Sequence, residues 1–335
     1  MNPEFLEQLI ADGLPISKTS RFELLTGGVS SEIYRIDTDR KIFVVKRALK
    51  KLKVKSDWFA DVSRNDFEIK YLEYVAQFLP NAVPKLLGRG SGYFVMEFLD
   101  QGFSNWKTLL MGGDFQETHA QEAGRVLGKI HQHSYSDKAV AKQFNSLQNF
   151  TQLRISPYLL HCAERHPLVA PEILKEAERL KNTQECLVHG DYSPKNILIS
   201  KKRMVVVDCE VAFYGDAAFD IAFLSSHLLL KGLYHAPRYT NLEHFVKAFL
   251  LTYEKERDGT YDFQELQKRT ARLLPMLLLA RVDGKSPVEY LSPDKQALTR
   301  EFALKQIAGK DPGLQAIIQT WFKTLQNATY LKAQK

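Results

Sequence analysis

The sequence predicts an α+β protein with a small strand-rich N-terminal lobe and a larger helical C-terminal lobe. Short apolar runs joined by turns fill residues 22–46 and recur over 85–97. Residues 220–335 carry an almost continuous helical pattern instead. The character of the chain changes at 98–102. With 335 residues, 44% of them hydrophobic, the chain is long enough to build both lobes around large cores.

The N-terminal lobe is expected to span residues 1–99 and to hold five strands, over 22–25, 33–36, 42–46, 85–87 and 93–97. One helix is expected over 65–79, because apolar side chains recur there at every fourth position, at Phe67, Tyr71, Val75 and Leu79. Together these elements make a compact α+β unit.

The C-terminal lobe is expected to span residues 100–335 and to begin with a helix over 117–134. Gly124 and Gly128 on this helix would allow a neighbouring element to approach closely. A second helix is expected from Pro171 to residue 180, since proline suits the first turn of a helix. Short strands follow, and helices fill the rest of the chain.

The most informative stretch is His189-Gly190-Asp191, followed by Asn196 and then by Asp208 at the end of an apolar run. A carboxylate and an amide five residues apart, with a second carboxylate closing a strand, are the groups that phosphoryl transfer needs. One takes or orients the proton of an attacking hydroxyl, and the others hold Mg²⁺ on the phosphates. A polar loop between two strands is the alternative for the first three residues alone.

With its full spacing, this stretch resembles the Brenner motif of the aminoglycoside phosphotransferase and choline kinase superfamily of small-molecule kinases. The resemblance implies a protein-kinase-like bilobal fold that binds ATP and Mg²⁺ in a cleft between the lobes. It implies Asp191 as the catalytic base, and Asn196 and Asp208 as Mg²⁺ ligands. Glu210 is expected on the same side of an extended segment as Asp208, either as a further metal ligand or paired locally.

The phosphate loop is expected at residues 26–31, where Gly27, Gly28, Ser30 and Ser31 lie between two strands. Glycines let backbone amides approach phosphate closely, and serine hydroxyls add donors. An ordinary hairpin turn explains two adjacent glycines equally well. The superfamily carries a similar short Gly-Gly-x-Ser loop over the phosphates, so the resemblance favours the phosphate reading.

Lys46 ends a strand of the N-terminal lobe, where a kinase needs a cation on the phosphates that is held by a helix carboxylate. Glu68 is the expected partner and Glu73 is a second one, while a capping box from Asn65 to Glu68 is the structural alternative. The resemblance also implies that backbone groups from Glu97 to Leu99 pair with the adenine edge.

Two further residues are expected to support the catalytic loop. The resemblance implies that Asp220 braces the loop backbone, although a helix N-cap also explains an aspartate at the start of an apolar helix. His189 is expected to orient the loop rather than to transfer protons.

The acceptor is expected to be a small molecule with a hydroxyl group. Asp220 follows Asp208 by only twelve positions, too few for the activation segment with which a protein kinase docks a peptide. Residues 208–221 and 281–291 are similar to segments of methylthioribose kinase, which implies a sugar-like acceptor and a substrate role for Arg281. A helix C-terminus or Asp283 is the alternative partner of Arg281.

Other functions are kept as alternatives. An aminoglycoside or an amino alcohol such as choline is the alternative acceptor, although residues 240–335 are not acidic. A catalytically inactive nucleotide-binding pseudokinase is the alternative from another class. Nucleic-acid binding by the basic residues 46–55 is not expected, because that tract lacks interleaved aromatic residues.

Composition sets the remaining expectations. The N-terminus does not resemble a secretory signal, and no apolar run is long enough to span a membrane. Three cysteines, Cys162, Cys186 and Cys209, fit no zinc spacing or disulfide framework and are expected to pack in a reducing cytosol. We therefore expect a cytoplasmic enzyme without a nucleic-acid or membrane partner. The sequence leaves its oligomeric state open.

Overall fold

The computed structural model describes residues 1–25, 31–49, 64–100, 102–236, 238, 242–257, 259, 261–309 and 313–333, with side chains described up to residue 327. The chain forms two compact units. Unit 1 contains residues 1–103 and 200–210, and unit 2 contains residues 104–199 and 211–335. The predicted lobes divided the chain at residue 99 and did not include the return of residues 200–210 to the first unit.

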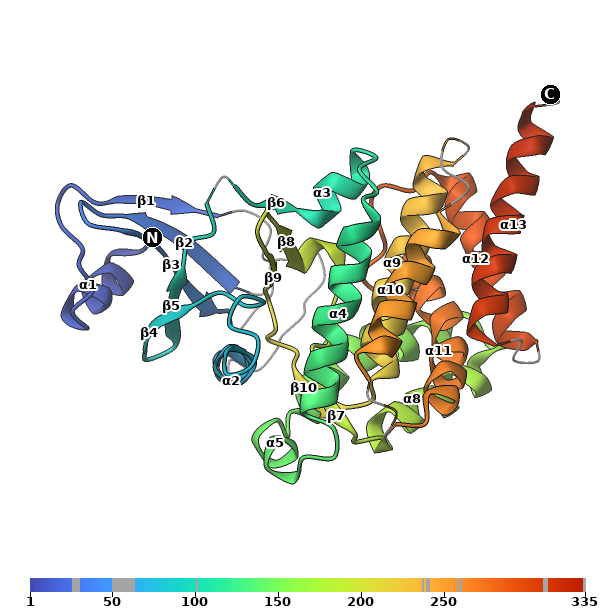
Figure 1. Cartoon of the computed structure of the whole chain (residues 1–335), viewed down its shortest axis with the longest axis horizontal. Coiled ribbons are helices and arrows are strands. Elements are labelled where there is room, and N and C mark those ends of the chain that lie inside the picture. The colour runs from blue at the N-terminus through green and yellow to red at the C-terminus, as the bar shows by residue number, and fades with distance from the viewer. Residues whose placement is uncertain are drawn as a thin grey trace. The chain divides into compact units, whose positions relative to one another are not determined.

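Unit 1 is built on a five-stranded antiparallel sheet in the order β1-β2-β3-β5-β4. Its strands are β1 (Arg21–Leu24), β2 (Ser31–Asp37), β3 (Ile42–Ala48), β4 (Leu86–Gly90) and β5 (Tyr93–Glu97). Helix α2 (Arg64–Ala76) overlaps the helix expected over 65–79. The short strand β9 (Met204–Val206) belongs to the returning segment. The strand-rich first unit is confirmed, as its sheet shows in Figure 1.

Helix α1 (Pro3–Ala11) is part of unit 1 and was not predicted. Asn2 caps it, since its side-chain oxygen accepts a hydrogen bond from the backbone nitrogen of Phe5 at 2.8 Å. Phe5 and Leu9 are spaced four residues apart and pack into the core of the sheet with Tyr34 and Phe43. The capping residue, the proline in the first turn and the apolar spacing are all visible in the sequence, and together they would have predicted this helix.

Unit 2 is mostly helical, and its helices agree with the predicted pattern. Its long helices are α4 (Glu117–His133), α8 (Ala170–Asn182), α9 (Ala218–His235), α10 (Glu243–Lys255), α11 (Phe263–Asp283), α12 (Pro293–Ala308) and α13 (Leu314–Ala333). Shorter helical segments are α3 (Trp106–Met111), α5 (Lys138–Gln143), α6 (Leu147–Phe150), η1 (Thr151–Leu160), α7 (His161–Arg165) and η2 (Pro194–Asn196). Short strands are β6 (Ser104–Asn105), β7 (Cys186–Val188), β8 (Ile197–Ile199) and β10 (Phe213–Gly215), with β7 paired to β10 and β6 to β8.

Helix α9 forms the centre of unit 2, because almost all of its side chains are buried. Helix α11 is also mostly buried, and Figure 1 shows both among the helices of this unit. All three cysteines of the chain are buried and form no disulfide, as expected from their spacing. In the described part of the chain, no helix combines the length and apolar character needed to cross a bilayer.

The glycines of α4 allow α10 to approach closely, as predicted. A Cβ atom on Gly124 would lie 2.4 Å from the carbonyl oxygen of Phe249, and one on Gly128 would lie 2.9 Å from that of Tyr253. Backbone cannot yield as a flexible side chain can, so the two helices would have to separate.

We expect Gly124→Ala to destabilise unit 2. The better helix propensity of alanine offsets about 1 kcal/mol, while overpacking costs about 1–3 kcal/mol or more, so the net change should lower the melting temperature. Thermal unfolding of Gly124→Ala beside Gly112→Ala, whose added Cβ would meet only ordinary contacts of 3.4 Å or more, measures this. Equal melting temperatures for the two variants would show that α4 and α10 can separate at no cost.

Candidate functional site

Asp220 of α9 binds the backbone of the loop between β7 and β8. One Asp220 carboxylate oxygen accepts the backbone N–H of His189 at 2.7 Å, and the other accepts that of Gly190 at 2.9 Å. The His189 ring nitrogen Nδ1 in turn accepts the backbone N–H of Asp191 at 3.1 Å. Gly190 has a φ of +75°, and a Cβ there would meet the backbone of Val211 at 2.7 Å, so only glycine fits.

Asp220 is therefore a brace for the loop and not an N-cap. It is the third residue of α9, and the backbone N–H of Ala218 is instead accepted by the carboxylate of Asp216 at 2.9 Å. His131 of α4 is fully buried, with Nε2 3.3 Å from Asp220 and Nδ1 2.9 Å from the Tyr253 hydroxyl. Burial lowers the pKa of His131, so neutral imidazole is favoured there.

Asp191 lies at the centre of a cluster of donors. One of its carboxylate oxygens, Oδ2, lies 2.8 Å from the side-chain nitrogen of Asn196, 2.9 Å from Nζ of Lys195 and 3.1 Å from Nη2 of Arg154. The Asn196 nitrogen also donates to the Asp191 carbonyl at 3.0 Å, which leaves the amide oxygen of Asn196 directed to other ligands. The sequence brought Asp191 and Asn196 together correctly but did not single out Arg154 or Lys195.

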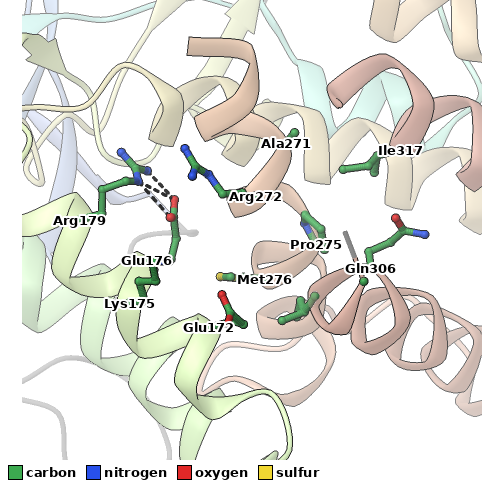
Figure 2. A pocket seen from close by; sticks show the side chains of 12 residues that line it. Glu172, Lys175, Glu176, Arg179, Ala271, Arg272, Pro275, Met276, Gln306 and Ile317 are labelled. Atoms are coloured by element: carbon green, nitrogen blue, oxygen red, sulfur yellow. Dashed lines mark hydrogen bonds and ion pairs between the residues drawn. The ribbon is translucent and has the colours of Figure 1, made fainter. Parts of the chain in front are cut away.

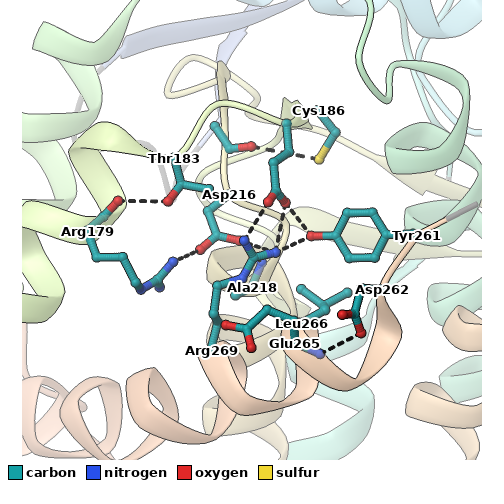
Figure 3. A network of polar contacts seen from close by, with 12 residues as sticks. Arg179, Thr183, Cys186, Asp216, Ala218, Tyr261, Asp262, Glu265, Leu266 and Arg269 are labelled. Atoms are coloured by element: carbon teal, nitrogen blue, oxygen red, sulfur yellow. Dashed lines mark hydrogen bonds and ion pairs between the residues drawn. The ribbon is translucent and has the colours of Figure 1, made fainter.

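A second polar network supports the end of this loop region, as Figure 3 shows. Asp216 is fully buried and receives ion pairs from Arg179 and Arg269. Arg269 also pairs with Glu185, which lies directly before β7, and the Tyr261 hydroxyl donates to the same carboxylate. Burying Asp216 requires such partners, and they fix β7 against the start of α9 and α11.

Unit 1 contains a buried lysine between two carboxylates. Nζ of Lys46 on β3 lies 2.7 Å from Glu68 of α2 and 2.7 Å from Asp208. Burial alone would lower the pKa of Lys46, but the charges of Asp208 and Glu68 outweigh it and raise the pKa, so the ammonium stays charged. Of the two glutamates offered by the sequence, Glu68 makes this contact, while Glu73 lies 3.6 Å from Arg89. Asn65 is the second residue of α2, so the capping-box alternative is wrong.

The segment from Asp208 to Glu210 is not extended, which corrects the geometry expected for it. Asp208 has a φ of +63°, a conformation that costs free energy for any residue but glycine, and Glu210 lies in a turn. Oxygen atoms of Glu68, Asp208 and Glu210 nevertheless lie within 4.8 Å of one another. The turn, and not an alternating strand, brings the two acidic side chains of this segment together.

These oxygens suit a hard divalent cation, since Mg²⁺ prefers carboxylate and amide oxygen ligands. Glu68 is committed to Lys46, and one oxygen of Glu210 lies 3.0 Å from Nε of the buried Arg64. Asp208 is the most exposed of the three acids, with 26% of its side chain accessible. Asp208 and the remaining oxygen of Glu210 are therefore the candidate metal ligands of unit 1.

The other residues predicted for nucleotide binding are placed in part. Gly27, Gly28 and Ser30 lie outside the described residues. Ser31 begins β2, and its buried hydroxyl finds no hydrogen-bond partner among the residues that the structure describes. Glu97 and Leu99 line a pocket of about 480 Å³ in unit 1 together with the turn at residues 200–203. The Glu97 carboxylate accepts the backbone N–H of Lys85 at 2.8 Å and pairs with Arg203 at 2.6 Å, so it is already occupied.

Arg281 ends the buried part of α11, as expected, but Asp283 is not its partner. Nη1 of Arg281 donates to the carbonyl of Ser286 at 2.6 Å and to the Tyr158 hydroxyl at 3.1 Å. The Asp283 carboxylate is bound by Arg300 at 2.6 Å and by His166 at 2.9 Å. Arg281 therefore keeps donor capacity for other groups.

Another pocket, of about 260 Å³, lies among α8, α11, α12 and α13 (Figure 2). Figure 2 shows Glu176 paired with Arg179 at its edge, the same arginine that holds Asp216. None of the residues predicted for the site lines it.

Comparisons with known proteins agree with this geometry. Residues 21–259 match the family model described as "Phosphotransferase enzyme family" (APH). Methylthioribose kinase of Bacillus velezensis is 30% identical over 256 residues, which cover 65% of this chain and 64% of that protein. Methylthioribose kinase of Pectobacterium atrosepticum is 28% identical over 218 residues, or 56% and 54% of the two chains. The chain thus spans less than two thirds of the length of these curated relatives.

Two solved structures share the fold. The amicoumacin kinase hAmiN, solved with AMP-PNP, Ca²⁺ and amicoumacin, aligns with a TM-score of 0.62 at 14% identity over 93% of this chain and 95% of that one. A choline/ethanolamine kinase family protein from Mesorhizobium loti aligns with a TM-score of 0.56 at 15% identity over 98% and 100%. The predicted protein-kinase-like α+β fold is confirmed.

Proposed function

The chain belongs to the phosphotransferase enzyme family, and on that premise we propose that it moves the γ-phosphate of ATP to a hydroxyl of a small, sugar-like metabolite. The observation that carries the proposal is Lys46 held between Glu68 and Asp208, because a buried lysine with a strained aspartate beside it has no structural need. The methylthioribose kinases among the relatives support a sugar-like acceptor.

In the proposed reaction, the acceptor oxygen forms a bond to the γ-phosphorus, and the bond from that phosphorus to the β-bridging oxygen breaks to release ADP. The Asp191 carboxylate takes the hydroxyl proton. Asn196, Lys195 and Arg154 hold that carboxylate in one orientation. Lys46 would bind the phosphates, and Asp208 and Glu210 of unit 1 would hold a Mg²⁺ ion that supplies charge neutralisation. In unit 2, the amide oxygen of Asn196 is a candidate Mg²⁺ ligand of the same chemistry.

Asp191, Asn196, Lys46 and Asp208 are all present, which favours an active enzyme over a pseudokinase. An acceptor such as an aminoglycoside or choline is less suited, because polycations and quaternary amines favour acidic or aromatic cage sites. Arg154 and Lys195 beside the proposed base would repel them.

Asp208→Ala tests the proposed metal site. We expect it to remove most of the Mg²⁺-dependent gain in AMP-PNP affinity, roughly tenfold or more, because charge-assisted contacts are worth about 1.5–3 kcal/mol. The dissociation constant of AMP-PNP should be measured by calorimetry with Mg²⁺ and with EDTA.

Asp66→Ala is the matched control, since Asp66 is an exposed residue of α2 in the same unit. The control should bind AMP-PNP as the unchanged protein does. If Asp208→Ala retains the full Mg²⁺ effect, the acidic cluster is not the metal site. If the unchanged protein binds no AMP-PNP, the proposed function itself is wrong.

A further inference from the structure

One face of α9 carries Phe223, His227 and Lys231 at four-residue intervals, so the three side chains lie on one side of the helix. The Phe223 and His227 rings have their centroids 5.0 Å apart, and Nζ of Lys231 lies 3.8 Å from the centroid of Tyr290. The face runs about 12 Å along α9, at about 1.5 Å of rise per residue.

Lys231 is the unusual member of this face. Only 1% of its surface is exposed, yet no carboxylate and no hydrogen-bond acceptor among the described residues contacts its ammonium. Its ammonium makes a cation–π contact with Tyr290. Burying an ammonium without an anionic partner costs several kcal/mol, so a structural role would be served better by an apolar side chain.

Two more polar groups beside Lys231 lack partners. Nε of Arg281 and the hydroxyl of Tyr290 are both buried and form no hydrogen bond within the described residues. The positive charge of Arg281 acts to lower the pKa of Lys231 and of Tyr290. Buried hydrogen-bond donors that have no acceptor in the protein are typical of a site that binds an oxygen-rich ligand.

The charge around this face is strongly positive. The cations Lys107, Arg154, Lys195 and Arg281 act on Tyr158, His227 or Lys231, and the carboxylates that act on them are Asp191 and Glu289. Asp191 is shared by Arg154 and Lys195, and Glu289 pairs with Lys107. Burial and the charges of Arg281, Lys231, Lys195 and Lys107 all lower the pKa of His227, so His227 stays neutral and adds no further positive charge.

A continuous set of contacts joins this face to Asp191. The Arg154 guanidinium that contacts Asp191 lies 5.7 Å from the Phe223 ring centroid and 5.8 Å from that of Tyr158. The Tyr158 hydroxyl accepts the hydrogen bond from Arg281. A small molecule whose hydroxyl reaches Asp191 would therefore extend over Phe223 and His227 toward Lys231 and Arg281.

We propose that the acceptor carries an anionic group, a carboxylate or a phosphate monoester, which binds between Lys231 and Arg281. The inference rests on the proposed function, since it names the class of acceptor for the same reaction. An anion would pair with the Lys231 ammonium and would accept from Nε of Arg281 and from the Tyr290 hydroxyl. The neutral methylthioribose named for the relatives would leave all three groups unpaired.

The first test measures anion binding directly. The protein is saturated with AMP-PNP and Mg²⁺, so that phosphate cannot enter the nucleotide site, and is then titrated with inorganic phosphate and with gluconate by calorimetry. We expect at least one of them to bind, Lys231→Met to weaken that binding at least tenfold, and Lys231→Arg to restore most of it.

Lys268→Met is the matched control, because Lys268 is an exposed lysine of α11 with 62% of its side chain accessible. It should bind the anion as the unchanged protein does. If the unchanged protein binds neither anion, or if Lys231→Met binds as tightly as the control, the anionic subsite does not exist.

The second test compares acceptors. Ribose 5-phosphate and methylthioribose differ chiefly in the charge of the group at carbon 5, ribonate offers a carboxylate, and choline and kanamycin are cationic. We expect kcat/KM for ribose 5-phosphate or ribonate to exceed that for the neutral and cationic acceptors at least tenfold. The better of the two anions identifies the group.

The outcomes separate the two proposals. Faster turnover of methylthioribose, choline or kanamycin would overturn the anionic acceptor and leave the phosphotransferase function standing. Absence of AMP-PNP binding would overturn the phosphotransferase function. The anionic subsite would then still be decided by whether Lys231→Met, but not Lys268→Met, weakens the binding of phosphate or gluconate.

Discussion

Asp191→Asn is expected to lower kcat by about 10³-fold and to leave the dissociation constant of AMP-PNP with Mg²⁺ nearly unchanged. The change keeps the shape of the side chain but removes the basic carboxylate. Asn196, Lys195 and Arg154 now contact one oxygen of that carboxylate, Oδ2, and an amide oxygen can still accept from them. The loss therefore belongs to proton removal from the acceptor and not to assembly of the loop.

The loop itself must be shown to survive the substitution. Arg154 is nearly buried, so losing its anionic partner has a cost in stability, and the melting temperature should be recorded for each variant. Asp114→Asn is the matched control, because Asp114 is a partly exposed residue between α3 and α4 that contacts Gln116. Retention of most of the kcat by a folded Asp191→Asn would remove Asp191 from the role of base.

The sequence predicted the parts of the fold that depend on local pattern. The strands of the first unit and the helices α2, α4 and α8 follow from apolar spacing, and the close approach at Gly124 follows from glycine in a helix. The return of residues 200–210 to unit 1 could not be predicted, because it depends on contacts with residues far away in the sequence. Contacts such as that from the backbone of Val206 to Ala82 carry no local signal.

In the candidate site, too, local sequence pattern predicted some residues and missed those that depend on the surrounding structure. Asp191, Asn196 and Asp208 stand out because their types and spacing match a reaction, whereas the spacing argument for Asp208 and Glu210 assumed an extended backbone that the positive φ of Asp208 contradicts. A strained residue is invisible to pattern, since strain is imposed by surrounding structure. Arg154 and Lys231 were missed because a single arginine or lysine in a helix is ordinary until its burial is known.

The acceptor KM is expected to rise up to about tenfold for each pH unit above 7, because Lys231 must be protonated to bind an anion. Burial, followed by the charges of Lys107 and Arg281, lowers the pKa of Lys231 to about 7, against a smaller opposing effect of Glu289. Below pH 7 the ammonium is present, so KM for a carboxylate acceptor should be level, whereas above pH 7 the ammonium is progressively lost.

The pKa shifts of three neighbouring groups point away from this range. Despite burial, the pKa of Glu289 is lowered by its hydrogen bond with Lys107, burial lowers the pKa of His227 well below its usual value, and burial raises that of Tyr290. The pH dependence should therefore report Lys231 alone. Lys231→Arg, which keeps its charge up to pH 9, should show a level acceptor KM across pH 6–9, and the KM for ATP should not follow the same profile in either protein.

Stability gives a second readout of the same residue. The pKa of Lys231 in the folded protein lies below that of a lysine in the unfolded chain, so the unfolded chain binds more protons between pH 7 and about 10.5. The buried ammonium therefore destabilises the fold fully below pH 7. This destabilisation decreases as pH rises and is absent above about pH 10.5. Lys231→Met should therefore raise the free energy of unfolding by about 2–4 kcal/mol at pH 7 while it weakens acceptor binding, with the gain shrinking as pH rises. Denaturant unfolding of Lys231→Met and of the unchanged protein at pH 7 and pH 9.5 measures the gain in the free energy of unfolding at each pH. A less stable Lys231→Met would mean that the ammonium supports the fold, and its burial would then need no ligand.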